Sequence, residues 1–275
     1  MKTMAESIRR MRQRKRVTQQ TLGEALGVDG RTVSKWETGV SAPDIALLPM
    51  LARYFGISMD ELFCYRSDAL SEKQRFVRFM ADHGMLRFGE FALQSGRFSP
   101  YYVSSLGSHA ASELTRLGAF FARAVYEYAP QTATLAVGAQ RELPLAVATG
   151  LVLYDKYGVE SDCCTVESLG KEVFPSAVTL LCDTLTSGQT LRTVLQAAQK
   201  QCGGVPGRVI VSVDRMERGE HPTLSARREI ERNFATKIIP IVTYTDILQA
   251  VQENVVAGDA EALKIYGELY TEVTT

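Results

Sequence analysis

Five short apolar runs alternate with amphipathic stretches between residues 134 and 243. This pattern constrains the fold of the chain more than any other feature of the sequence. Runs of this length that are apolar throughout are typical of strands buried on both faces, and helices between them connect parallel strands. We therefore predict a doubly wound parallel sheet, whose ligands bind beyond the carboxyl ends of the strands. The runs are TLAVGA, SDCCTV, AVTLLCD, GRVIVSVD and KIIPIVT, separated by stretches such as LPLAVATGLVLYDKYG and LRTVLQAAQKQCG.

The N-terminal segment has a different pattern, with apolar residues at helical spacing and short turns between them. Thr18 is placed to cap a second helix that ends at Gly27, and Asp29 is placed to cap a third. Val33 and Trp36 share the buried side of that third helix. PDIALLPMLARYFG and SMDELF complete a predicted bundle of five helices. We place an all-α domain at 1–66, a linker at 67–76 and the α/β domain at 77–275.

The balanced charge of the whole chain conceals an asymmetry. The formal net charge is +0, but residues 1–66 hold eleven Lys and Arg against seven Asp and Glu, which gives +4, so the remainder carries −4. A basic helical domain on an acidic body indicates a polyanionic partner for the helical domain alone. A solvated cationic helix face would give the same count.

The second and third predicted helices are joined by the tight turn LGVD, which is the arrangement of a helix-turn-helix. In TQQTLGEALGV, TVSKWETG and the Pro that follows, the segment resembles the Cro/C1-type (XRE family) helix-turn-helix domains. The resemblance implies that double-stranded DNA is the partner and that the third helix enters the major groove. A five-helix bundle that binds only protein is the alternative.

Five residues are the candidate DNA contacts. Arg31 and Lys35 lie four residues apart, opposite the buried side, and either could donate to guanine O6 and N7. Thr32 and Ser34 suit phosphates, and Gln19 matches the family position that binds the DNA backbone.

A strand, a small-residue loop and a helix follow one another in TLLCDTLTSGQT. Free backbone N–H groups and the helix dipole favour an anion at such a place. We therefore predict that this segment binds a phosphorylated ligand. The candidate residues are Asp183, Thr186, Ser187, Gly188, Gln189 and Thr190.

Five segments in order look like those of an orotate phosphoribosyltransferase, from about residue 72 to 270: LRFGEFALQSGRFSPYYV, TLLCDTLTSGQTLRT, VDRMERG, SARREIERNF and AEALKIYGELY. The resemblance implies a phosphoribosyltransferase-like fold and a homodimer. It implies an enzyme that joins orotate to the ribose of phosphoribosyl pyrophosphate with Mg²⁺. It assigns the ribose hydroxyls to Asp183, the 5-phosphate to residues 186–190, and the orotate carboxylate to Thr186 and Arg215. A helix cap at a strand end is the alternative for Asp183.

Two further residues are candidates for the base side of the site. Arg141 could replace a lysine that the family uses in its pyrophosphate-binding turn. Tyr102 could stack on a base, although packing is the alternative for a tyrosine at this place.

The chain departs from the family at positions that the family uses for catalysis. Cys182 stands in place of a second acid, Gln94 in place of a lysine, and Glu142 puts an anion where pyrophosphate would bind. The family's long Lys- and His-rich loop is replaced by ESLGKEVFPS, with a lone Lys171. Since the transfer depends on cations and on a lid that excludes water, we predict no catalytic residues.

We therefore predict a DNA-binding regulator whose degenerate domain dimerises and senses phosphoribosyl pyrophosphate or a nucleotide, on a palindromic operator. One alternative is an active orotate phosphoribosyltransferase that controls its own transcription. The other is a second domain that dimerises and binds no ligand.

The cysteines, the histidines and the apolar runs argue against a disulfide-rich, a metal-binding and a membrane protein. The five cysteines form no CxxC pair, and the three scattered histidines give no metal-ligand spacing. No apolar run approaches the roughly 18 residues of a membrane span, and we expect no signal peptide. We predict a cytoplasmic protein without resident metal or membrane contact. It requires no cofactor, and Mg²⁺ would enter only with phosphoribosyl pyrophosphate.

Overall fold

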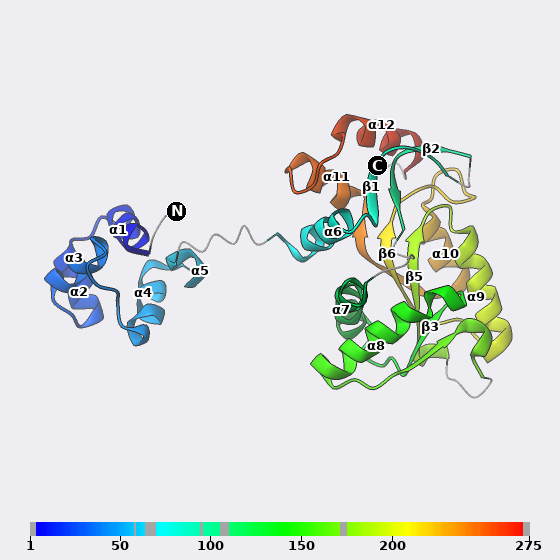
Figure 1. Cartoon of the computed structure of the whole chain (residues 1–275), viewed down its shortest axis with the longest axis horizontal. Helices are drawn as coiled ribbons and strands as arrows, with labels where there is room; N and C mark the ends of the chain where they lie inside the picture. The colour runs from blue at the N-terminus through cyan, green and yellow to red at the C-terminus, as the bar shows by residue number, and fades with distance from the viewer. Residues whose placement is uncertain are drawn as a thin grey trace. The chain divides into compact units, whose positions relative to one another are not determined.

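The computed structural model describes residues 4–57, 59–63, 70–93, 96–104, 110–170 and 175–271. The chain divides into two compact units, Met1–Leu70 and Ser71–Thr275, each of which is shown in Figure 1. The second half of the predicted linker at 67–76 is not a linker, because the second unit already begins at Ser71. Ser71 caps helix α6 (Glu72–Asp82), and Phe76 of that helix is fully buried in the core of the second unit.

The first unit is a bundle of short helices around one apolar core. Thr18 Oγ1 accepts a hydrogen bond from the Thr21 N–H at 3.0 Å, and Asp29 accepts one from the Arg31 N–H at 2.6 Å. Gly27 adopts φ 72° after the second helix, so the predicted caps and the predicted stop are confirmed. The elements are α1 (Met4–Arg14), α2 (Gln19–Leu26), α3 (Gly30–Glu37), η1 (Ile45–Leu47), α4 (Leu48–Phe55) and α5 (Met59–Leu62).

The second unit is built on a five-stranded sheet in the order β4-β3-β5-β6-β7. Every pair of neighbouring strands in this sheet is parallel. Each of the five apolar runs forms one strand, which confirms the predicted doubly wound sheet. The strands are β3 (Thr134–Val137), β4 (Asp162–Thr165), β5 (Val178–Leu185), β6 (Arg208–Asp214) and β7 (Lys237–Thr243).

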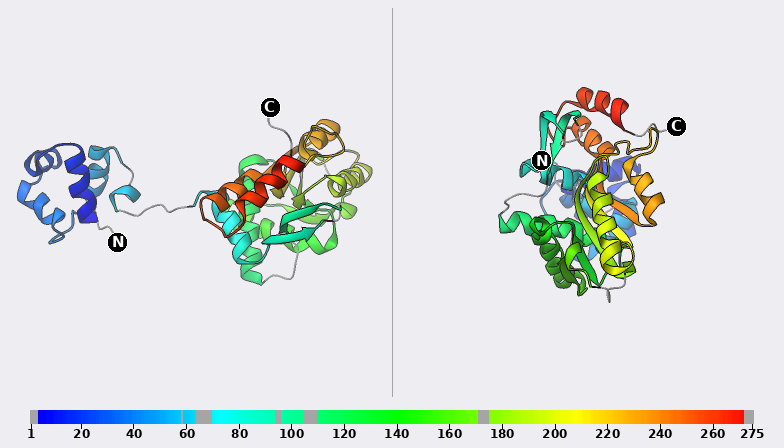
Figure 2. Two further views of the ribbon diagram at one scale, coloured as in Figure 1. Left: turned by 90° about the horizontal axis from the view of Figure 1, so that it is seen from above. Right: turned by 90° about the vertical axis from the view of Figure 1, so that its right-hand side faces the viewer.

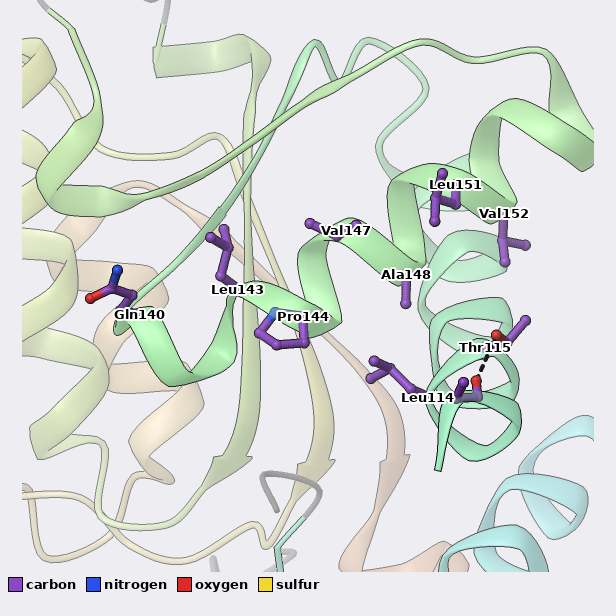
Figure 3. A pocket seen from close by; sticks show the side chains of 10 residues that line it. Leu114, Thr115, Gln140, Leu143, Pro144, Val147, Ala148, Leu151 and Val152 are labelled. Atoms are coloured by element: carbon purple, nitrogen blue, oxygen red, sulfur yellow. Dashed lines mark hydrogen bonds between the residues drawn. The ribbon is translucent and has the colours of Figure 1, made fainter. Parts of the chain in front are cut away.

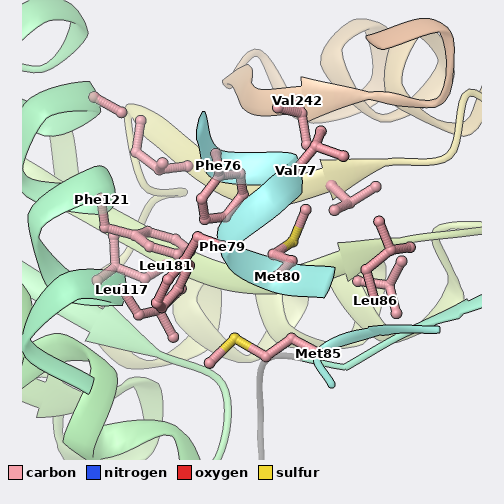
Figure 4. Close-up of a cluster of buried hydrophobic side chains, with 14 of the residues drawn as sticks. Phe76, Val77, Phe79, Met80, Met85, Leu86, Leu117, Phe121, Leu181 and Val242 are labelled. Atoms are coloured by element: carbon pink, nitrogen blue, oxygen red, sulfur yellow. The ribbon is translucent and has the colours of Figure 1, made fainter. Parts of the chain in front are cut away.

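Helices cover both faces of this sheet because successive residues of a strand point to opposite sides. Leu181 joins the core under α6, α7 and α8 that Figure 4 shows, whereas Leu180 joins a second core under α9 and α10. The right-hand view of Figure 2 shows these two helix layers with the sheet between them. The helices are α7 (Ala111–Tyr128), α8 (Leu143–Tyr157), α9 (Gln189–Cys202), α10 (Ala226–Phe234), α11 (Tyr244–Gln252) and α12 (Ala260–Tyr270), with 3₁₀ turns η2 (Gln140–Glu142), η3 (Val166–Ser168) and η4 (Pro175–Ala177).

A separate antiparallel hairpin, β1 (Leu86–Ala92) and β2 (Phe98–Val103), packs against α12. Its Tyr101 is fully buried, and Tyr102 is half-buried with its ring centroid 5.5 Å from that of Phe91. Among the described helices, none combines the length and the apolar character that crossing a bilayer demands.

Candidate functional site

The α3 helix of the first unit presents polar side chains on the face opposite its core contacts. Val33 and Trp36 are 0% and 3% exposed and hold the helix against the bundle. Arg31 and Lys35 are exposed on the other side, and Thr32 and Ser34 between them are half-buried. The structure therefore leaves the two predicted base-reading side chains accessible on one helix surface.

Gln19 has a contact inside the unit that the sequence did not predict. Its Nε2 donates to Glu37 Oε2 at 2.8 Å, and the same carboxylate accepts from Arg12 Nε at 2.5 Å and from Arg12 Nη2 at 2.9 Å. Arg12 also donates from Nη1 to the Val17 carbonyl at 2.9 Å. This network ties α1, α2 and α3 together, and so fixes the orientation of α3 in the bundle. The sequence did not distinguish Arg12 from the other cationic residues around it, so its structural role was not predicted.

Glu37 should therefore contribute to the stability of the first unit in a pH-dependent way. Burial alone would raise the pKa of Glu37, but hydrogen bonds from Arg12 and Gln19 outweigh it and lower the pKa. A carboxyl whose pKa is lowered on folding stabilises above its unfolded pKa, and this contribution is lost as the pH falls through the folded value. We expect Glu37→Gln to reduce the free energy of unfolding by about 2–3 kcal/mol at pH 7. The difference should shrink as the pH falls below the usual pKa range of a glutamate, because the wild-type carboxyl then begins to protonate.

Urea unfolding followed by tryptophan fluorescence measures this, because Trp36 is the only tryptophan and lies in the first unit. Glu24→Gln on the exposed side of α2 is the matched control and should change little. Equal urea midpoints for wild type and Glu37→Gln at pH 7 would contradict the prediction.

In the second unit, the six predicted ligand residues are brought together where β5 runs into α9. Gly188 adopts φ 80° as the N-cap of α9, and a Cβ there would lie 2.7 Å from Ile230 Cδ1 and 3.2 Å from Ala226 Cβ. Glycine suits this place because its φ lies in the left-handed region, and any Cβ would also press on the terminal methyl of Ile230. No side chain of the described residues caps α9, so its first backbone N–H groups can donate to an anion. Gln189 and Thr190 are exposed there, and Thr186 and Ser187 are half-buried.

Arg192 holds this loop in place, a role that the sequence did not predict. Its Nη1 donates to the Ser187 carbonyl at 3.1 Å, and its Nη2 lies 2.9 Å from a carboxylate oxygen of Glu229 on α10. Its place in the first turn of α9 is the signal that could have found it.

The pair Cys182 and Asp183 lies at the carboxyl end of β5. Asp183 is held by the Ser212 hydroxyl, which donates to its backbone carbonyl and to its Oδ1 at 3.4 Å. Burial, and then the negative charges of Glu142 and Asp183, raise the pKa of the Cys182 thiol, so the thiol is neutral at pH 7. A neutral thiol beside one carboxylate does not fit Mg²⁺, which prefers oxygen ligands. Among the described residues there is no cluster of three or more His, Cys, Asp or Glu that could hold a metal.

Glu142 folds back onto the turn that follows β3. Its Oε2 accepts from the Gly138 N–H at 3.1 Å and from the Ala139 N–H at 3.3 Å. Burial and then the charge of Asp183 raise the pKa of Glu142, against the opposing effect of those hydrogen bonds and of Arg141. Arg141 itself is exposed in the same turn.

Arg215 is enclosed in a buried polar cluster and is 1% exposed. Its Nε donates to Glu217 Oε1 at 2.6 Å, and its Nη2 donates to Ser99 Oγ at 2.7 Å and to the Tyr266 hydroxyl at 2.9 Å. Its guanidinium lies 4.0 Å from the Tyr101 ring centroid. The cluster joins β6 to the hairpin and to α12, so a ligand carboxylate would have to displace one of these partners.

The three base-side candidates thus have different environments. Arg141 is exposed after β3, Arg215 is buried, and Tyr102 lies half-buried in the hairpin under the guanidinium of Arg87, 5.0 Å from the ring centroid. Gln94 and Lys171, two of the predicted departures, lie outside the described residues.

Comparisons with known proteins agree with both resemblances. Residues 8–62 match the helix-turn-helix family. The orotate phosphoribosyltransferase of Pseudomonas fluorescens (strain SBW25) is 33% identical over 189 residues, which are 65% of this chain and 88% of that protein. That of Vibrio vulnificus (strain CMCP6) is 30% identical over 212 residues, which are 72% and 97%. The crystal structure of the Francisella tularensis enzyme matches with a TM-score of 0.61 at 24% identity, over 72% of this chain and 100% of that one, which confirms the predicted fold.

Proposed function

Because this chain belongs to the orotate phosphoribosyltransferase family and also contains a helix-turn-helix domain, we propose that it is a transcriptional regulator that binds DNA and senses a phosphorylated ribose compound. One observation carries the proposal. The loop at 186–190 keeps the geometry of an anion site, while the neighbouring turn holds its own carboxylate, Glu142, and the adjacent strand end holds a neutral thiol, Cys182.

These same residues argue against phosphoribosyl transfer. The reaction releases pyrophosphate, and its transition state needs positive charge where the negative charge develops. Glu142 and Asp183 instead put two carboxylates at this edge of the sheet, and Arg141 is the cation in the turn. The similarity to the curated enzymes favours the alternative, an enzyme that controls its own transcription, and the test below separates the two.

The DNA-binding part of the proposal rests on α3. Arg31 and Lys35 would read base edges in a major groove, and Thr32, Ser34 and the first turn of α2 at Gln19 would contact phosphates. As a regulator of transcription, the protein would act in the cytoplasm. It needs no resident cofactor, and Mg²⁺ would accompany only a ligand that brings its own pyrophosphate oxygens.

The second unit would supply the dimer through an exposed apolar face on α8. Val147, Leu151 and Tyr154 are 43%, 67% and 63% exposed, at helical spacing on one side of the helix. Figure 3 shows Val147 and Leu151 together with Leu114 of α7, around a shallow pocket between the two helices. Large apolar side chains gathered in this way mark an interaction surface. The same face on a second copy is a suitable partner, because a two-fold interface is self-complementary and a palindromic operator needs two reading helices.

The proposal is tested by selecting DNA sites from a random pool and then measuring operator affinity with and without phosphoribosyl pyrophosphate or orotidine 5′-monophosphate. We expect a palindrome with half-sites about one helical turn apart, and a change in affinity of about 5- to 150-fold with one of the two compounds. The same solutions, given orotate and Mg²⁺, should form no orotidine 5′-monophosphate above background. A clear rate would establish the enzyme instead, and an affinity that neither compound changes would rule out the sensor.

A further inference from the structure

Two neighbouring strands end at the same edge of the sheet, each followed by a turn that leads into a helix. In the β3–β5 pair Val137 lies opposite Leu181, and β5 continues past this point to Leu185. The turn after β3 therefore lies beside Cys182 and Asp183. A doubly wound sheet binds its ligand where neighbouring strands send their connections in opposite directions, as β3 and β5 do, so the two turns flank the expected ligand position.

The two turns differ in what their backbone N–H groups contact. After β3, the N–H groups of Gly138 and Ala139 donate to Glu142 Oε2 at 3.1 and 3.3 Å. After β5, no described side chain caps α9. One anion position at this edge is thus filled by a carboxylate of the chain, and the other is open to an anionic group of the ligand.

The charges around Glu142 support its place beside this ligand position. Its carboxylate lies close enough to Cys182 and Asp183 to influence the pKa of the thiol and to be influenced by the carboxylate. An acid at position 182 would add a third carboxylate to this group, and the neutral thiol avoids that repulsion. A pyrophosphate would meet both Glu142 and Asp183 as like charges and would have to displace Glu142 from its two N–H donors.

We infer that the ligand is a nucleoside 5′-monophosphate and not phosphoribosyl pyrophosphate, because Glu142 occupies the position of the second anionic group. The inference rests on the proposed function, since it also places the 5′-phosphate at residues 186–190. Glu142 is the residue that sets this selectivity. Because its carboxylate accepts from the Gly138 and Ala139 N–H groups, these donors are not available to a pyrophosphate.

Calorimetry on the full chain tests this, with uridine 5′-monophosphate and phosphoribosyl pyrophosphate as probes, each with Mg²⁺. We expect the wild type to bind the monophosphate at least about tenfold more tightly than the pyrophosphate compound. Glu142→Ala frees both N–H groups and removes a charge, so the affinity for phosphoribosyl pyrophosphate should rise at least about tenfold. The affinity for the monophosphate should stay within about twofold.

Two further variants keep the test sharp. Glu142→Gln loses the charge but can still accept from the two N–H groups, so its gain should be smaller, and it decides the matter if Glu142→Ala does not fold. Gln140→Ala, at an exposed residue of the same turn, should behave as the wild type. The inference is overturned, with the proposed function intact, if the wild type binds phosphoribosyl pyrophosphate as tightly as the monophosphate or if neither Glu142 variant gains affinity. No heat from either probe on the wild type overturns both.

Discussion

The double variant Arg31→Ala/Lys35→Ala is expected to bind the selected operator at least about 100-fold more weakly than the wild type. Each proposed base contact would contribute about 1–3 kcal/mol, and the proposed dimer would make each contact twice. Both side chains are exposed, so neither substitution removes a contact with the core on Val33 and Trp36. The loss should fall mainly on specific binding. Affinity for a random duplex should decrease far less, since phosphate contacts supply that term.

Electrophoretic shift titrations at one salt concentration, with the operator and with a scrambled duplex, separate these two terms. Arg53→Ala is the matched control, because it removes one exposed positive charge from α4 and leaves α3 intact. If the double variant lost affinity equally for the operator and the scrambled duplex, Arg31 and Lys35 would be phosphate contacts and the reading of base edges would lie elsewhere. Tight operator binding by the double variant would exclude α3 as the reading helix.

The fold was predictable because its signals are local. Each strand of the sheet coincides with a short, mainly apolar run, and the caps at Thr18, Gly27 and Asp29 depend on residues no more than a few positions away. The predicted linker extends too far along the chain, because the residues at 72–75 are polar although α6 begins there and Phe76 packs in the core of the second unit. Buried side chains on an otherwise charged helix are hard to recognise without their partners.

The side-chain contacts of the site were not predictable, because they join residues far apart in the sequence. Arg215 bonds to Ser99 and Tyr266, which lie 116 and 51 residues away, and these contacts enclose a residue that the family resemblance assigns to the ligand. Gln19 meets Glu37 across 18 residues in the same way. Glu142 is the exception, since it contacts N–H groups only three and four residues before it, and its spacing after Gly138 predicts that the carboxylate can reach them.

The second large effect is expected from Leu151→Asp, which should convert the proposed dimer into a monomer. Leu151 is 67% exposed on α8, so the substitution should leave the folded second unit unchanged. In a two-fold interface through this face, each aspartate would be buried without a partner, and the two would repel each other. A monomer loses the linkage between its two half-site contacts, so its operator affinity should fall at least about 100-fold while each half-site contact stays intact.

Sedimentation velocity measures the oligomeric state of Leu151→Asp, and operator titration measures its affinity for DNA. Calorimetry with uridine 5′-monophosphate checks that the second unit is unchanged, because its affinity for the monophosphate should equal that of the wild type. Ile265→Asp is the matched control, because Ile265 is 51% exposed on α12 and the same charge is placed on another apolar surface. We expect the control to remain a dimer with full operator affinity. A Leu151→Asp chain that stays dimeric would move the interface away from α8. A monomer that still binds the operator tightly would mean that one helix-turn-helix domain suffices, so that the phosphorylated ligand cannot regulate by aligning two of them.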